Sequence, residues 1–343
     1  MNNSIKAAVL GATGYVGLEL IKILSNHPKV QIKFLGSETP SKNISEFDNH
    51  INSSILPKLE YNNNFNPTKI DVVFLALPHG ISHKYVKKYF NYLKIIDLSA
   101  DFRLDKREDY IADYKDDHSC TELLNKFVYG LPELYENQIS ITNNLAVPGC
   151  YPTSILLPLI PLLKNNLIKG DNIIIDSKSG YSGAGKKFDK NNIQKGNLLN
   201  FYNYNTNNHR HIGEIYQELQ KQTNQEINFS FNPHILPIYR GMLSTIYCDL
   251  NEKIHISDIE NCLNNTYQNT PFVHHMIGEE RGDFFLVQNT NNCYIKLQKH
   301  SNSSKIIIVS LIDNLLKGAS GQAVQCMNIM FDLKQITGLE SHK

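Results

Sequence analysis

The fold is decided near the N-terminus by the stretch Lys6-Ala7-Ala8-Val9-Leu10-Gly11-Ala12-Thr13-Gly14-Tyr15-Val16-Gly17. The apolar run before Gly11 predicts a short buried strand, and the leucines and isoleucines after Gly17 recur at the spacing of an amphipathic helix. Strand, glycine turn and helix in this order form the dinucleotide-binding corner of a doubly wound α/β sheet, where a pyrophosphate rests on the helix N-terminus. We therefore expect cofactor contacts from Gly11, Thr13, Gly14, Tyr15, Val16 and Gly17.

The loop after the second predicted strand (Val30 to Leu35) bears on which dinucleotide binds. An NAD enzyme usually carries an acidic residue here, which holds the ribose 2′-hydroxyl, and Glu38 is in that place. Three hydroxyl residues and one lysine could instead bind a 2′-phosphate: Ser37, Thr39, Ser41 and Lys42. A polar surface loop is the alternative. The G-x-x-G-x-x-G spacing is associated with NADP enzymes, so we expect NADP(H), with Ser37 in the site.

Two further buried strands are predicted at Asp71–Leu77 and Lys94–Leu98. The loops that follow leave the carboxyl ends of these strands, where such sheets bind ligands. The second loop carries Arg103, whose planar guanidinium matches a phosphate. A surface salt bridge with Asp101 or Asp105 is an equal alternative.

A single cysteine stands at the start of another predicted helix, in Pro148-Gly149-Cys150-Tyr151-Pro152-Thr153. Pro148 and Gly149 bend the chain, and Pro152 suits a first helical turn. A helix N-terminus favours the thiolate, which is the form that attacks carbonyl carbon. Most free cysteines are small buried side chains, but the turn and helix signals around Cys150 favour a catalytic nucleophile.

Beyond Cys150 the pattern changes from alternating strands and helices to a mixed or antiparallel sheet. Strands are predicted at Asn172–Ser177, Leu243–Leu250 and Cys293–Gln298. We expect a Rossmann-type domain at residues 1–146 and a second, α+β domain for substrate and dimerisation at residues 147–318. Residues 319–343 should return to the first domain, because the apolar residues of a final helix (Ala319–Phe331) recur at helical spacing and need a surface to cover.

A histidine cluster, His209-Arg210-His211, lies within the second predicted domain. Two histidines at this spacing could form half of a metal site, but no second group of ligands completes it, so we expect no metal. A histidine that serves Cys150 as general acid and base is the better functional interpretation.

Composition is consistent with an enzyme and excludes several other classes. The chain has 343 residues and a formal net charge of +1, with no block of basic residues, so nucleic acid and anionic membranes are not expected partners. No run is long enough to span a membrane, and no signal peptide is recognised. The six cysteines form no C-x-x-C pair and are typical of reduced cytoplasmic thiols.

Eight ordered motifs resemble those of the N-acetyl-γ-glutamyl-phosphate reductases, within the aspartate-semialdehyde dehydrogenase group. They are Gly11-Ala12-Thr13-Gly14-Tyr15-Val16-Gly17, Leu77-Pro78-His79-Gly80, Asp97-Leu98-Ser99-Ala100-Asp101-Phe102-Arg103, Tyr129-Gly130-Leu131-Pro132-Glu133-Leu134, Pro148-Gly149-Cys150-Tyr151-Pro152-Thr153, Ser182-Gly183-Ala184-Gly185, His209-Arg210-His211 and Asp313-Asn314-Leu315-Leu316-Lys317-Gly318-Ala319. The resemblance covers essentially the whole chain. It departs after Ser37, where relatives often carry an arginine, and at Val147, Asn207 and Asn208.

The resemblance implies NADPH-dependent reduction of N-acetyl-γ-glutamyl phosphate to N-acetyl-L-glutamate 5-semialdehyde, an arginine-biosynthesis step, through a thioester on Cys150. It implies that His209 is the acid/base and that Arg103 binds the departing phosphate. Asn314 would bind the nicotinamide amide, and Ser182 and Gly183 would also contact the cofactor. The implied substrate-pocket residues are Tyr204, His211, Glu214 and Arg240. The protein would be a cytoplasmic homo-oligomer, a dimer or a tetramer, acting on a small molecule.

Two alternatives remain at this point. A sister enzyme acting on aspartyl or aminoadipyl phosphate would share Cys150 and the glycine turn; the histidine cluster argues against the aspartyl enzyme only. A catalytically silent NADP-sensing protein would need the turn but would have no use for a thiol at a helix start.

Overall fold

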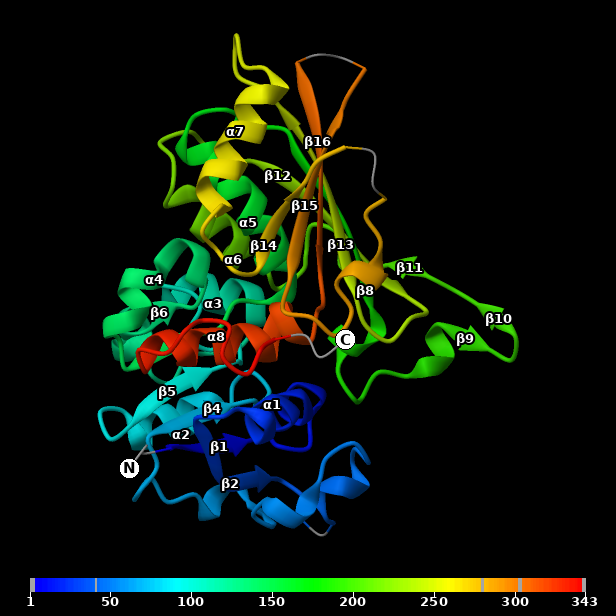
Figure 1. The fold of residues 1–343 in the computed structure, drawn as a ribbon. Helices are drawn as coiled ribbons and strands as arrows, with labels where there is room; N and C mark the ends of the chain where they lie inside the picture. The colour runs from blue at the N-terminus through cyan, green and yellow to red at the C-terminus, as the bar shows by residue number, and fades with distance from the viewer. Residues whose placement is uncertain (1–3, 41, 279–280, 302–303, 341–343) are drawn as a thin grey trace. The chain divides into compact units, whose positions relative to one another are not determined.

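The computed structural model describes residues 4–40, 42–278, 281–301 and 304–340, which form two compact units (Figure 1). The first unit comprises Met1–Pro148 together with Ala319–Lys343, and the second is Gly149–Gly318. Each unit has its own seven-stranded sheet.

The sheet of the first unit is parallel throughout, with strand order β3-β2-β1-β4-β5-β7-β6. Its strands are β1 (Ile5–Leu10), β2 (Val30–Ser37), β3 (Leu59–Tyr61), β4 (Val72–Leu75), β5 (Lys94–Asp97), β6 (Val128–Tyr129) and β7 (Asn144–Ala146). All four residues of β4 are buried, as expected for a central strand covered on both faces. The doubly wound sheet predicted from the sequence is confirmed, and the predicted strands at β1, β2, β4 and β5 agree to within two residues at either end.

The helices of this unit are α1 (Tyr15–Asn26), α2 (Ser82–Tyr89), α3 (Arg107–Tyr114), α4 (Pro132–Ile141) and α8 (Gly321–Met330). Helix α8 packs against α1 and α4, and all ten of its residues are buried. Asn328 of α8 contacts His27 (Oδ1 to Nε2, 3.0 Å), and Gln322 donates to the carbonyl of Gly130 at 3.1 Å. The helix expected from Ala319 begins two residues later, because a π-helical turn (η8, Leu316–Ser320) precedes it.

The second unit contains a mixed sheet of order β11-β12-β8-β13-β16-β15-β14, which confirms the sequence prediction. Its strands are β8 (Ile173–Gly180), β11 (Tyr202–Asn203), β12 (Phe229–Leu236), β13 (Met242–Asp249), β14 (Val273–Met276), β15 (Cys293–Lys299) and β16 (Lys305–Ile312). A separate hairpin pairs β9 (Gln194–Lys195) with β10 (Leu198–Leu199). Single-turn and other short 3-10 helices are η1 (Ile44–Glu46), η2 (Ser53–Ile55), η3 (Asn62–Asn64), η4 (Thr121–Lys126), η5 (Tyr181–Ala184), η6 (Lys190–Asn192) and η7 (Phe284–Leu286).

Helix α5 (Cys150–Lys164) packs on β13 and β16 and contacts α6 (Ile212–Gln220) and α7 (Ile256–Tyr267). It contains two internal prolines, Pro158 and Pro161, which the sequence-based helix did not take into account. Pro161 has no N–H to donate to the carbonyl of Leu157. The hydroxyl of Tyr267, in α7, donates to that carbonyl instead. A neighbouring helix therefore supplies a bond that α5 cannot make.

No helix among the residues that the structure describes is both long enough and apolar enough to cross a membrane.

Candidate active site

Cys150 is the first residue of α5, and contacts from α5 and α6 fix the backbone at this helix start. The N–H of Gly149 donates to Oε1 of Glu214 in α6 at 2.9 Å. The main-chain N–H and the hydroxyl of Thr153 both donate to the carbonyl of Gly149, at 2.9 and 3.0 Å. Glu214 is buried, whereas Cys150 is partly exposed. The thiol thus stands at a fixed helix N-terminus and remains accessible.

The aromatic cluster beside Cys150 consists of Tyr151, Tyr204, His209, His211 and Phe231. Nε2 of His209 lies 3.3 Å from the Tyr204 hydroxyl, and that hydroxyl lies 3.4 Å from the hydroxyl of Tyr151. The rings of Tyr151 and Phe231 meet His209 edge-on, with centroids 5.4 and 5.5 Å away. The segments carrying Cys150 and His209 are therefore brought together through Tyr151.

The electrostatics of the cluster place Cys150 within it. Burial, with the nearby Cys150 adding to it, raises the pKa of Tyr204 to about 12. Burial also raises the pKa of Tyr151 well above its ordinary value, and Cys150 contributes there too. Burial, followed by the positive charge of Arg210, lowers the pKa of His209 to about 3. His209 is therefore a neutral imidazole at neutral pH.

The second histidine of the motif orients the first. The main-chain N–H of His211 donates to Nδ1 of His209 at 3.2 Å. A neutral ring that accepts a proton donor at Nδ1 carries its own proton on Nε2, the nitrogen that faces Tyr204. The ring of His211 lies 4.8 Å from that of His209, and both histidines are buried. His211 is the N-cap residue of α6.

Three residues with expected cofactor contacts cluster at the end of β8. Nδ2 of Asn314 donates to the Ser182 hydroxyl at 2.9 Å, and Oδ1 of Asn314 accepts from the N–H of Gly241 at 2.8 Å. A Cβ placed on Gly183 would lie 3.6 Å from the same Asn314 amide nitrogen. The three residues, predicted from two separate motifs, thus meet in the second unit.

Arg240, expected in the substrate pocket, pairs with a buried carboxylate. Its Nε lies 2.9 Å from Oδ2 of Asp313, and its guanidinium also contacts Asn289. Asp313 accepts further main-chain donors from Asn289, Leu315 and Leu316. Burial raises the pKa of Asp313, with Arg240 opposing the shift. Asp313 therefore holds both Arg240 and the segment that carries Asn314.

In the first unit, the three glycines of the turn have three different steric settings. Gly11 has φ +82°, and a Cβ on it would lie 2.2 Å from the carbonyl oxygen of Ala76. A Cβ on Gly17 would lie 2.2 Å from the Gly11 carbonyl oxygen. Within the described part of the chain, a Cβ on Gly14 would meet only that same oxygen, at 3.5 Å. The protein itself requires glycine at 11 and 17, whereas Gly14 leaves open the approach that a pyrophosphate needs.

The rest of the turn links to the end of β2. Thr13 Oγ1 and Ser37 Oγ lie 3.2 Å apart, and the N–H of Thr39 donates to Ser37 Oγ at 3.1 Å. Tyr15 and Val16 open α1, where the first N–H groups of a helix have no intrahelical partner. Lys42 is exposed. Ser41 lies outside the described residues.

Arg103 braces two loops at the carboxyl ends of parallel strands. Its Nε donates to the carbonyl of Val147 at 2.7 Å, and Nη2 donates to the carbonyl of Leu98 at 3.1 Å. It is partly exposed. Its expected partner Asp101 is buried and accepts from the N–H groups of Gly80 and Ser82 at 2.7 and 3.0 Å.

Comparisons with known proteins agree with the fold. Among solved structures, aspartate semialdehyde dehydrogenase II from Vibrio cholerae superposes with a TM-score of 0.71 at 15% identity, covering 96% of this chain and 99% of that chain. The enzyme from Candida albicans, solved with NADP, gives 0.68 at 18% identity, with 96% and 99% covered. At this identity the likeness concerns the fold. Family models match as the NAD binding domain of semialdehyde dehydrogenase over residues 6–142 and as its dimerisation domain over residues 150–314.

Closer relatives decide the family. N-acetyl-gamma-glutamyl-phosphate reductases from Ehrlichia canis (strain Jake) and Ehrlichia ruminantium (strain Gardel) are 41% and 44% identical, covering 99% of this chain and 99% and 98% of theirs. That of Clostridium botulinum (strain Eklund 17B / Type B) is 41% identical, with 98% of each chain covered. The chain belongs to the N-acetyl-γ-glutamyl-phosphate reductase family.

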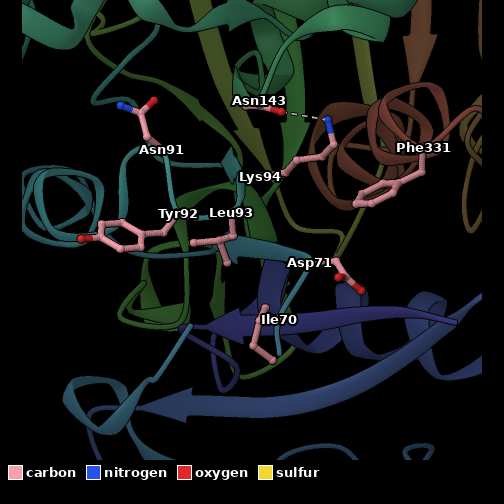
Figure 2. A pocket seen from close by; sticks show the side chains of 8 residues that line it. All are labelled: Ile70, Asp71, Asn91, Tyr92, Leu93, Lys94, Asn143 and Phe331. Carbon is pink, nitrogen blue, oxygen red and sulfur yellow. Dashed lines mark hydrogen bonds between the residues drawn. The ribbon is translucent and has the colours of Figure 1, made fainter. Parts of the chain in front are cut away.

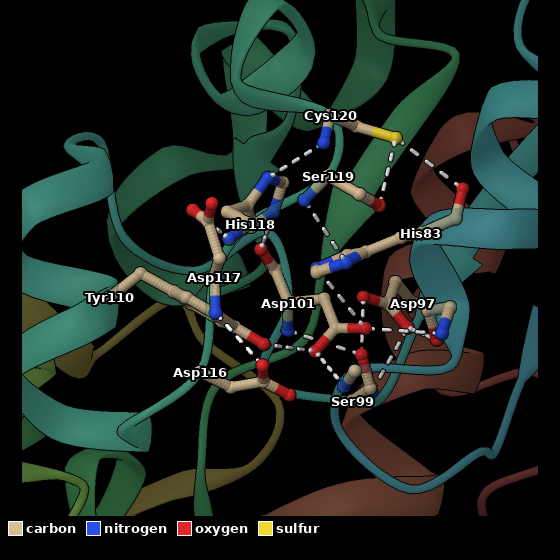
Figure 3. Close-up of polar contacts among 12 residues, drawn as sticks. His83, Asp97, Ser99, Asp101, Tyr110, Asp116, Asp117, His118, Ser119 and Cys120 are labelled. Carbon is tan, nitrogen blue, oxygen red and sulfur yellow. Dashed lines mark hydrogen bonds and ion pairs between the residues drawn. The ribbon is translucent and has the colours of Figure 1, made fainter.

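For this family member, sequence reasoning missed a buried polar network around Asp97 and Asp101 (Figure 3). The Ser82 hydroxyl donates to Asp97 at 2.9 Å, and the Tyr110 hydroxyl donates to Asp101 at 3.1 Å. The ring of His118 bonds the Asp101 carbonyl at 2.6 Å. Burial, with Asp101 adding to it, raises the pKa of Asp97 to about 7. Both aspartates belong to the motif Asp97 to Arg103. Two carboxylates so close together in a mostly apolar stretch were the sequence signal that could have revealed this network.

Sequence reasoning also missed Gly318. A Cβ on Gly318 would lie 2.7 Å from Cβ of Cys150, so only glycine lets this segment lie against the thiol's residue. Among the described residues of this N-acetyl-γ-glutamyl-phosphate reductase family member, no three His, Cys, Asp or Glu side chains are grouped so that they could hold a metal ion.

The first unit also has a pocket that is separate from the candidate site residues described above (Figure 2). It has a volume of about 370 Å³ and is lined by residues that include Asp71, Lys94, Asn143 and Phe331. The first three stand at or just before the N-terminal ends of β4, β5 and β7. The glycine turn and Arg103 follow the carboxyl ends of strands, so this pocket belongs to the opposite edge of the sheet.

Proposed function

We propose that this chain reduces N-acetyl-γ-glutamyl phosphate to N-acetyl-L-glutamate 5-semialdehyde with NADPH, in arginine biosynthesis. The first unit would bind the dinucleotide and the second would carry the chemistry. The observation that carries the proposal is Cys150 at the start of α5, held through Glu214 and beside the Tyr151, Tyr204 and His209 cluster. The identity of the acyl group is taken from the activity for which the relatives are named.

Cys150 is the proposed nucleophile. Its thiolate sulfur attacks the acyl carbon, the carbon–oxygen bond to phosphate breaks, and phosphate leaves with the electron pair, which gives a thioester on Cys150. The N–H groups at the start of α5 are suitable donors for the tetrahedral oxyanion. Arg103 is the proposed ligand of the departing phosphate, because its guanidinium matches phosphate geometry.

The glycine turn fits a dinucleotide, since a Cβ on Gly14 would stand where the pyrophosphate approaches and, of the residues that the structure describes, would meet only the Gly11 carbonyl oxygen. NADPH, when bound, supplies the hydride that reduces the thioester. Collapse of the resulting thiohemiacetal breaks the carbon–sulfur bond, releases the aldehyde and restores the Cys150 thiolate. Ser182, Gly183 and Asn314 are the proposed contacts of the cofactor in the second unit.

His209 is the proposed proton-transfer residue. With Nδ1 bonded to the His211 N–H, the neutral ring presents an Nε2–H group that can donate a hydrogen bond to the thiohemiacetal oxyanion. To take the thiol proton at Nε2, the ring must adopt the other tautomer and release the His211 contact. Tyr204, whose raised pKa keeps its hydroxyl protonated, is a proposed donor to substrate oxygen.

His211, Glu214 and Arg240 are the remaining proposed substrate-pocket residues. Each has a defined structural contact as well: His211 with His209, Glu214 with Gly149, and Arg240 with Asp313. Arg240 is the natural ligand for the substrate's α-carboxylate, because arginine binds carboxylates through two parallel hydrogen bonds.

The test is the reverse reaction, phosphate-dependent reduction of NADP⁺ with N-acetylglutamate semialdehyde, run beside aspartate semialdehyde and aminoadipate semialdehyde. Turnover with the N-acetylated substrate that exceeds the other two by at least about a hundredfold supports the proposal. A higher rate with either other aldehyde would assign the chain to a sister activity, and absence of turnover with all three would leave the NADP-sensing alternative.

We also propose that the chain works as a cytoplasmic homo-oligomer, a dimer or a tetramer. Ser244 on β13 contacts Ser154 of α5 at 2.7 Å, so that face of the second sheet is covered. The opposite face carries Ile174, Tyr247 and Ile307, paired in register; Ile174 is 52% exposed. A second copy would cover this apolar face. Light scattering should show the oligomer, and Tyr247→Glu should reduce its size.

A further inference from the structure

The carboxylate of Glu38 is exposed but fixed in position beside the glycine turn. Glu38 follows β2 directly, and its Oε1 accepts a hydrogen bond from Nδ2 of Asn62 at 2.7 Å. Asn62 is 2% exposed and lies directly after β3. A buried amide therefore anchors a carboxylate that faces solvent.

The same amide also binds the turn. Oδ1 of Asn62 accepts the N–H of Gly11 at 3.2 Å. A Cβ on Gly36 would lie 2.3 Å from that oxygen, so the glycine in β2 makes room for Asn62. Through one side chain, Glu38 is tied to the first glycine of the dinucleotide turn.

The other side chain expected at the ribose faces inward. Ser37 is 1% exposed, and its hydroxyl is engaged with Thr13 and with the N–H of Thr39. At the end of β2 the anchored, exposed group is thus a carboxylate. At this place in a doubly wound sheet, a carboxylate accepts from the adenosine ribose hydroxyls and repels a 2′-phosphate.

We propose that Glu38 sets the cofactor specificity of this chain: held by Asn62, it binds the ribose 2′-hydroxyl and opposes the 2′-phosphate, so that NAD(H) is accepted alongside NADP(H). The inference rests on one part of the proposed function, namely that the glycine turn binds a dinucleotide.

The test measures the dissociation constants of NADH and NADPH for the full chain, with no acyl substrate present. The protein has no tryptophan, so the nicotinamide fluorescence of the bound cofactor gives the signal. Glu38→Gln keeps an oxygen that can accept the Asn62 amide and removes only the charge. The matched control is Glu60→Gln, since Glu60 is exposed on β3 and pairs in register with Gly36.

We expect the wild-type constants for the two cofactors to lie within about tenfold of each other. Glu38→Gln should tighten NADPH relative to NADH by roughly five- to tenfold, the effect of one solvent-exposed charge at contact distance. This gain should shrink in 1 M salt, which screens charge repulsion. Glu60→Gln should leave the ratio unchanged.

Wild-type binding of NADPH more than a hundredfold tighter than NADH would overturn the inference, as would Glu38→Gln shifting both constants equally or not at all. If wild-type protein shows no reductase activity toward the proposed substrate while Glu38→Gln still shifts the ratio of the NADPH and NADH constants, the proposed function alone is refuted. Failure of wild-type protein to bind either dinucleotide would refute both.

Discussion

The Glu214 carboxylate accepts the main-chain N–H of Gly149 at 2.9 Å, although 65 positions separate the two residues in the chain. The contact joins the first turn of α6, which follows the histidine motif directly, to the residue before Cys150. The segments that carry the proposed nucleophile and the proposed acid/base are thus joined by one buried side chain.

Glu214→Ala should lower kcat roughly ten- to a hundredfold with little change in NADPH binding, because the thiol loses its fixed position. Glu214→Gln, which keeps an acceptor oxygen, should recover much of the rate. Glu218→Ala is the control, since Glu218 is equally buried on α6 and pairs with Lys221. Equal losses in Glu214→Ala and Glu218→Ala would indicate a general effect on α6 instead.

His209→Asn should lose roughly 10²–10⁴-fold in kcat, the usual range for a positioned acid or base. His211→Asn should cost less, because its main-chain N–H, which orients His209, is retained. Steady-state kinetics on both variants check this. A large loss of kcat in His211→Asn together with a small loss in His209→Asn would reverse the two roles.

Gly318→Ala should lower kcat about ten- to a hundredfold while Kd for NADPH stays the same. The added methyl would lie 2.7 Å from Cβ of Cys150 and must displace it. The rate of Cys150 alkylation by iodoacetamide, compared with kcat, reports the displacement. Unchanged alkylation and turnover would show that the segment can shift without moving the thiol.

Ionisation of the buried Asp97 carboxyl should lower the stability of the first unit as pH rises. Burial raises its folded-state pKa to about 7, above the ordinary 3.8, so the folded protein holds the proton more tightly than the unfolded chain does. Its stabilising contribution is complete below about pH 4 and is lost as pH rises toward 7. Tm measured from pH 4 to 8 should therefore fall less with pH in Asp97→Asn than in wild type or in the exposed control Asp109→Asn. Parallel curves for all three would contradict this.

The sequence predicted four strands of the first sheet because each contains a short apolar run bounded by glycine or polar residues, as in β1 before Gly11. It also placed Cys150 at a helix start, from the bend at Pro148 and Gly149 and from Pro152 in the first helical turn. It could not predict the anchoring of Glu38, because Asn62 reaches it from a single 3-10 turn (η3) of three asparagines, which carries no periodic pattern. The uninterrupted α5 depends likewise on Tyr267, more than a hundred positions from the carbonyl it satisfies.

Trapping the covalent intermediate tests the central claim most directly. Wild-type protein and Cys150→Ser are mixed with N-acetyl-γ-glutamyl phosphate in the absence of NADPH, and intact-mass and peptide mass spectrometry follow, with released phosphate counted. The account predicts one N-acetylglutamyl group on Cys150 per phosphate released in wild type, and neither in Cys150→Ser, whose hydroxyl is far less ionised than a thiol. Phosphate release with no acyl group on the protein, or an acyl group on another residue, would contradict it.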